Sequence, residues 1–176
     1  MSDSRELLAQ AKSIGRVVSW GAVAGAGATV VMSAWMYASQ RLGLLGRAPP
    51  RHIVEKGLAR LGLRHRVSVP ARQALTAALH LAFGATQGAV YALAEQGLAA
   101  SRHRELEPSL ARGVPFALAV WATSYAGWIP ALGILPPPSR DRPGRPTSMV
   151  IAHVVYGAAL AALLRRVELR RAAAHA

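Results

Sequence analysis

Four long segments of the chain contain no Asp, Glu, Lys or Arg. They cover residues 17–39, 74–93, 113–139 and 146–164, and linkers rich in arginine separate them. A helix that crosses roughly 30 Å of hydrocarbon needs about 20 predominantly apolar residues. A soluble amphipathic helix would instead present a charged face to water. The pattern therefore predicts an all-α integral membrane protein, a four-helix bundle, in preference to a soluble helical bundle.

We place the approximate spans at residues 17–39, 74–95, 113–135 and 148–164, in a single membrane domain that covers residues 1–176. The first apolar run is longer than the roughly 7 to 15 residues of a signal peptide core, so we expect a retained anchor. In the third span, Pro130 lacks the backbone donor that a continuing helix needs. This proline predicts a kink or a helix end near Trp128.

The linker at residues 40–73 contains a segment with an amphipathic pattern. After Pro49 and Pro50, apolar residues are interspersed with Lys56 and several arginines across residues 51–65. This pattern predicts an interfacial helix that lies on the membrane surface. An irregular basic loop is the alternative, because Gly57 and Gly62 both weaken a helix.

The chain carries 21 Lys and Arg against 8 Asp and Glu, which gives a formal net charge of +13. Nucleic acid is one class of partner for such a charge. However, the basic residues lie in linkers beside apolar spans, and no nucleic-acid-binding motif accompanies them. We therefore expect the lipid bilayer and its anionic lipid headgroups as partners, and no nucleic acid. The absence of cysteine excludes disulfides, thiolate catalysis and thiolate metal sites.

Small residues recur at helical spacing inside the predicted spans. Apolar association between helices gains little in lipid, so close van der Waals contact between backbones is what holds spans together. The positions that we expect to pack helix against helix are Gly21, Gly25, Gly84, Gly88, Thr123, Gly127 and Gly157. Some of these faces could instead contact a second copy of the chain or another membrane protein.

Two short patterns each occur twice along the chain. His-x-x-aromatic-Gly begins at His80 and again at His153, and Leu-Gly-x-Leu begins at Leu42 and again at Leu132. Two spans separate the equivalent elements, so both copies would have the same orientation in the membrane. The sequence therefore predicts two parallel helix-pair repeats, and chance matching of common residues is the alternative.

Three stretches resemble the YagU-like family of bacterial inner-membrane proteins: GAVAGAGATVVMSAWM at residues 21–36, HLAFGATQGAVYAL at residues 80–93 and MVIAHVVYGAALAALLRR at residues 149–166. The resemblance covers most of the chain. It implies an inner-membrane location and a loose association with acid tolerance, with no catalytic residues to carry over. The linker at residues 51–72 departs from the family pattern, which leaves the role of that segment open.

The candidate polar site inside the membrane consists of His80, Gln87, Tyr91, His153 and Tyr156. In a parallel repeat the two histidines lie at a similar depth, because each follows the start of its span by a few residues. Two imidazoles on neighbouring helices could bind a b-type haem axially or hold a metal ion. The other interpretation, which we prefer, is hydrogen bonding between helices without any cofactor or metal.

The polar residues of the second span also permit a transport function. His80, Gly84, Gln87, Tyr91 and Glu95 follow one another at intervals of three or four residues and share a helix face. Ionisable groups inside a membrane often mark routes for protons or solutes. A small proton or solute pathway is therefore a further alternative, although Glu95 at the helix end is more typical of an interfacial residue.

No arrangement of residues predicts an enzyme, because Ser-His-Asp and paired-carboxylate patterns are missing and the run GAVAGAG does not follow a strand. We predict a multi-pass protein of the bacterial inner membrane that is a non-catalytic accessory or stress-related component. A haem-binding or redox module that uses His80 and His153 is the first alternative. The two tails and the middle turn together hold 10 Lys and Arg residues, and the two other linkers together hold 11. These counts are too similar to decide which side of the membrane each set faces. We expect both termini in the cytoplasm, where short charged tails are commonly left.

Overall fold

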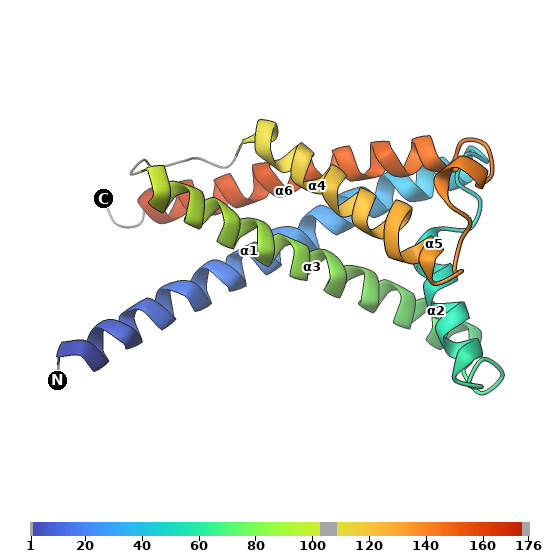
Figure 1. The fold of residues 1–176 in the computed structure, drawn as a ribbon, viewed down its shortest axis with the longest axis horizontal. Helices are drawn as coiled ribbons and strands as arrows, with labels where there is room; N and C mark the ends of the chain where they lie inside the picture. The colour runs from blue at the N-terminus through green and yellow to red at the C-terminus, as the bar shows by residue number, and fades with distance from the viewer. Residues whose placement is uncertain (1, 103–108, 174–176) are drawn as a thin grey trace.

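The structure is a computed structural model that describes residues 2–102 and 109–173, and its secondary structure within these ranges is entirely helical (Figure 1). The prediction of an all-α fold is therefore confirmed for the described residues. The elements in chain order are α1 (Ser2–Arg41), α2 (Pro49–Arg60), α3 (Val69–Arg102), α4 (Leu110–Thr123), the π-helix η1 (Ser124–Trp128), α5 (Ile129–Ala131), the 3-10 helix η2 (Pro138–Arg140) and α6 (Arg145–Ala173).

Three of the helices, α1, α3 and α6, extend beyond the uncharged runs that predicted them. Their flanking residues are largely Ala, Leu, Arg, Gln and Glu, all good helix formers, so the helices continue past the apolar segments. Two of the described helical segments, Glu6–Arg41 and Arg145–Val167, are long and apolar enough to cross a membrane. Length and composition are the basis of that finding.

The third predicted span, residues 113–135, is an interrupted helix. Regular α-helix ends at Thr123, the π-helix η1 follows, and the single turn α5 completes the segment. The amide of Ile129 donates to the carbonyl of Ser124, five residues earlier, which widens this turn. Pro130 cannot donate a backbone hydrogen bond, and the helix ends one residue later at Ala131. The proline therefore lies where the helix widens and ends, as its chemistry predicts.

The first linker contains helix α2, which covers Pro49–Arg60 and not the expected residues 51–65. It begins earlier because two prolines at its start need no hydrogen-bond partner for their missing amides. It ends earlier because Gly62 adopts φ +67°, and the amide of Leu63 then donates to the carbonyl of Leu58 and closes the helix end.

Helix α1 packs against both α3 and α6, and α4 packs against α6 (Figure 1). The largest fully buried side chains include Tyr125, Leu45 and Leu160, so the apolar core lies between the two helix pairs and below the linkers that connect them.

Glycines allow the helix backbones to touch at both crossings. A Cβ atom added to Gly88 would lie 2.6 Å from the Cα of Gly25, and one added to Gly21 would lie 2.6 Å from the carbonyl oxygen of Gly88. Gly84 lies at the same crossing and contacts Thr29. These residues bring α1 and α3 into backbone contact.

The α4–α6 crossing is built in the same way. A Cβ atom on Gly113 would lie 2.5 Å from the carbonyl oxygen of Gly157, and Gly113 was not among the predicted packing positions. The predicted positions Thr123 and Gly127 do not lie at a crossing. Thr123 is exposed and its hydroxyl donates to the carbonyl of Ala119, while a Cβ on Gly127 would meet its own helix.

Candidate functional site

A cavity of about 270 Å³ lies between the two helix pairs, near the end of the molecule that carries the linkers. Helices α3 and α4 converge at the other end, where the rings of Tyr91 and Phe116 pack with centroids 5.1 Å apart. Beyond that contact, Glu95 is 5% exposed and binds Arg112 through both carboxylate oxygens, each 2.8 Å from Nε. The cavity therefore occupies the space that opens where α3 and α4 diverge.

Seven of the described elements contribute to the cavity wall. The lining side chains are Thr29 and Met32 of α1; Pro49, Pro50, Ile53 and Val54 of α2; Thr76, Leu79, His80, Phe83, Gly84 and Gln87 of α3; Val120, Ser124, Tyr125, Trp128 and Ile129 of the α4–η1–α5 segment; and Met149, His153 and Tyr156 of α6. Most of these side chains are apolar. The π-helix supplies three of them, Ser124, Tyr125 and Trp128.

The structure brings together four of the five residues predicted for the polar site. His80 and Gln87 on α3 and His153 and Tyr156 on α6 all line the cavity. Tyr91 does not line the cavity, because it lies farther along α3, where Phe116 of α4 covers that face.

The two histidines differ in their hydrogen bonding. The Nδ1 of His153 lies 2.7 Å from the carbonyl oxygen of Met149. A carbonyl can only accept, so Nδ1 carries the proton and Nε2 keeps a free lone pair when the ring is neutral. The Nε2 of His80 is buried and has no hydrogen-bond partner among the described residues. A buried polar atom without a partner is costly, which makes this atom a candidate contact for a ligand.

Other polar groups around the cavity are already bonded within the protein. The hydroxyls of Thr29, Thr76 and Ser124 donate to carbonyls of their own helices. The hydroxyl of Tyr156 donates to the carbonyl of Gly84 at 2.8 Å, which links α6 to α3. The wall is therefore apolar in character, with the imidazole of His80 as a buried group whose hydrogen bonding is incomplete.

A smaller pocket of about 60 Å³ adjoins the cavity between α2 and α3. It is lined by Arg51, Glu55, Val69, Arg72, Gln73 and Thr76, so it shares Thr76 with the larger cavity. Arg51 donates to Glu55 at 2.9 Å, and this hydrogen bond holds the pKa of Glu55 below its usual range. Glu55 thus stays ionised and neutralises Arg51.

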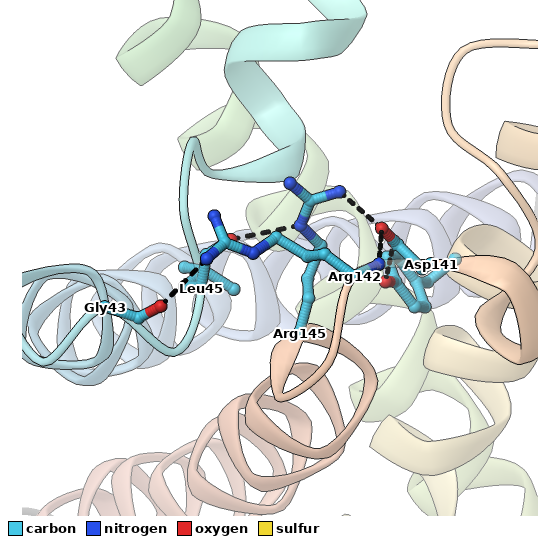
Figure 2. Close-up of polar contacts among 6 residues, drawn as sticks. Gly43, Leu45, Asp141, Arg142 and Arg145 are labelled. Atoms are coloured by element: carbon cyan, nitrogen blue, oxygen red, sulfur yellow. Dashed lines mark hydrogen bonds and ion pairs between the residues drawn. The ribbon is translucent and has the colours of Figure 1, made fainter.

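The linkers meet beside the cavity in a polar cluster whose central ion pair, Arg145 with Asp141, is buried (Figure 2). Arg145 donates to Asp141 at 2.6 Å and to the carbonyl of Leu45 at 3.0 Å. Asp141 also accepts hydrogen bonds from the hydroxyl of Tyr125 and from the amide of Arg142. The side chain of Arg142 reaches the carbonyl of Gly43 at 3.1 Å. The cluster fastens the second linker to the first.

This cluster was not predicted from the sequence. The available signal was Asp141, the single acid in that linker, placed four residues before Arg145. An acid and a base at that spacing can pair across one helical turn, although the spacing alone does not predict burial.

The donors present give little support to a metal ion. Among the described residues, no three His, Cys, Asp or Glu side chains lie close enough to share a metal ion. Around the cavity, His80 and His153 are the imidazoles that could ligate an axial cofactor.

Comparisons with known proteins add a family and no function. Comparisons with curated proteins and with solved structures gave no match. One family model, described as a family of unknown function, DUF6789, matches residues 15–175, which is most of the chain. The cavity, its histidines and the polar cluster all lie within the matched residues. Because the match covers most of the chain, the chain belongs to the DUF6789 family.

Proposed function

We propose that this protein is a multi-pass component of the bacterial inner membrane that holds a small, mainly apolar ligand in the cavity and has no catalytic role of its own. In the cell it would be an accessory or stress-related component, and acid tolerance is the context that the resemblance to YagU-like proteins implies. The observation that carries the binding function is the apolar cavity with the unpartnered Nε2 of His80 in its wall.

The surface of α3 supports the membrane assignment. Leu81, Val90 and Leu93, which lie outside the cavity lining, are 37%, 47% and 38% exposed, although they belong to the uncharged part of the helix. Soluble proteins rarely expose extended apolar patches of this kind, whereas lipid solvates them. This surface supports α3 as a span in addition to the helices α1 and α6.

Several matches support the proposal of two parallel helix-pair repeats. The helix ends at Gly43 and Gly133 have φ +75° and +62°, and the same three backbone hydrogen bonds close both ends, shifted by 90 residues. In the second helix of each pair, His80, Gly84 and Glu95 have counterparts 73 residues later in His153, Gly157 and Glu168. Gly84 and Gly157 each lie at the glycine contact of their pair.

The lack of cysteine allows a direct test of the four spans. Single substitutions Leu63→Cys and Ser139→Cys place thiols in the two linkers, Ala111→Cys places one near the opposite helix ends, and Val90→Cys places one within α3. We expect a membrane-impermeant maleimide to label the two linker thiols from one side of the membrane and Cys at position 111 from the other. The thiol at position 90 should stay unlabelled until the membrane is dissolved.

Two results would overturn the membrane proposal. Labelling at position 90 as fast as at position 63 in intact membranes would mean that α3 is in water. Recovery of the full chain as a monodisperse species in buffer without detergent or lipid would exclude an integral membrane protein altogether.

Haem binding is the second candidate, and a specific observation favours it: the two predicted histidines line one cavity, and His153 is oriented by a hydrogen bond to a carbonyl, as ligating histidines commonly are. These two imidazoles would hold the iron, and the haem would supply one-electron chemistry. A visible spectrum after haem-replete expression tests this candidate. A Soret band that both His80→Ala and His153→Ala abolish would support it, and the absence of a Soret band excludes it.

A further inference from the structure

The cavity and the smaller pocket adjoin at Thr76, and the two together, here called the path, follow α3 from a charged lining to an apolar one. Arg72 and Gln73 line the small pocket, Thr76 lines both, and Leu79 and Phe83 line the cavity. From Thr76 to Gln87 the helix rises by about 16 Å, at about 1.5 Å per residue. The path is therefore long enough for an alkyl chain, and it starts at cationic side chains.

The charge at the start of this path is positive. Glu55 is paired with Arg51 at 2.9 Å and also lies 3.6 Å from Arg47. Arg72 makes no ion pair with any of the described residues, and its side chain is partly exposed. One carboxylate is thus paired with two guanidinium groups, and Arg72 lines the same pocket as a further cation, which leaves capacity for an anion.

The position of Arg72 in the sequence fits this polarity. It lies just before the uncharged run at residues 74–93, at the level where a span enters the lipid headgroups, while the cavity lies at the level of the acyl chains. A ligand that occupied the whole path would have the same order of polar and apolar parts as a lipid in the surrounding bilayer.

We propose that the ligand is a single-chain anionic amphiphile, whose carboxylate or phosphate head binds Arg72 beside α2 and whose alkyl chain fills the cavity. The proposal rests on the binding function above and specifies the ligand of that site. Within the cavity the chain contacts Leu79, Phe83 and Ile53, and a polar substituent on the chain could reach the Nε2 of His80. The amphiphile would enter from the bilayer, past α2.

Fluorescence quenching tests the proposal, because Trp128 lines the cavity. The substitutions Trp20→Phe, Trp35→Phe and Trp121→Phe leave Trp128 as the single tryptophan of the four. Dibrominated stearic acid, in detergent at mildly alkaline pH, is the anionic probe, and its methyl ester is the matched probe with a neutral head. We expect saturable quenching by the acid.

A charge-assisted hydrogen bond contributes about 1.5 to 3 kcal/mol, so the acid should bind at least about tenfold more tightly than the ester. In Arg72→Gln the affinity for the acid should fall to that for the ester. In Arg66→Gln, which removes an exposed arginine outside both pockets, it should not change. Val120→Phe replaces a residue of the cavity wall with a larger one that fills part of the cavity, so it should weaken the binding of both probes.

The possible failures are distinguishable. Equal saturable binding of acid and ester, or an Arg72→Gln variant that still prefers the acid, overturns the anionic head and leaves the binding function in place. Quenching that never saturates with either probe overturns both proposals. A lysophosphatidic acid is then added as a competitor of the brominated acid. Displacement of the brominated acid indicates a phosphate head, retention of the brominated acid indicates a carboxylate head, and both results support the inference.

Discussion

Gly88→Ala is expected to lower the free energy of unfolding by about 2 kcal/mol or more, because overpacking against groups that cannot move costs about 1 to 3 kcal/mol. The added methyl group would lie 2.6 Å from the Cα and 2.8 Å from the amide nitrogen of Gly25. Both atoms belong to the backbone of α1, so relief requires the two helices to separate. Denaturation with SDS in mixed micelles, followed by tryptophan fluorescence, measures the effect.

Gly97→Ala is the matched control on the same helix. No heavy atom lies within 4 Å of a Cβ added at this position. Alanine is the better helix former, so this variant should be unchanged or more stable by up to about 1 kcal/mol. If Gly88→Ala and Gly97→Ala unfold at the same SDS fraction, α1 and α3 do not cross at these glycines.

Asp141→Ala is the second substitution with a large expected effect. The side chains of Asp141 and Arg145 are 2% and 9% exposed, and removal of the carboxylate leaves a buried guanidinium without its counter-charge. Loss of one partner of a buried ion pair costs about 3 to 5 kcal/mol. The hydroxyl of Tyr125 loses its acceptor as well. The same SDS denaturation measures the loss.

Two further variants separate this ion pair from the rest of the linker. Arg142→Gln removes an exposed hydrogen bond to Gly43 and should cost no more than about 1 kcal/mol. The double variant Asp141→Leu with Arg145→Met should recover part of the stability, since apolar residues can replace a buried ion pair. If Asp141→Ala is no more destabilising than Arg142→Gln, the pair does not hold the linkers together.

Local patterns in the sequence predicted the helices because their causes are local. Long uncharged runs form helices, Pro130 interrupts one, and glycines four residues apart identify a contact face. Helix ends were predicted less well, since α1, α3 and α6 continue through charged residues that favour helix as much as apolar ones do.

The site depends on contacts between distant segments, and the sequence predicted it in part. The stripe of His80, Gln87 and Tyr91 does lie on one face of α3, but α4 covers only part of that face. Phe116 packs on Tyr91, and Arg112 binds Glu95. The approach of α4 therefore decides which residues of the stripe line the cavity, and spacing along α3 contains no information about it.

Arg145, which is paired with Asp141, also binds the carbonyl of Leu45, 100 positions earlier in the chain. This contact requires both linkers to fold back over the helices. Neither linker has a periodic pattern that would predict the meeting. The cluster depends on tertiary structure. It could not be predicted, because a charged residue in a linker is normally expected to be exposed to solvent.

The π-helix at Ser124–Trp128 has a consequence for how the two helix pairs differ in length. Gly25 contacts Gly84 of α3, and Gly113 contacts the equivalent Gly157 of α6, so Gly25 and Gly113 are equivalent residues that lie 88 positions apart in the sequence. The glycines that end the same two helical segments, Gly43 and Gly133, lie 90 positions apart. The second pair therefore holds two more residues between its crossing and its helix end. A π-helical turn holds one more residue than an α-helical turn, so η1 accommodates one of these two extra residues within the segment that lines the cavity.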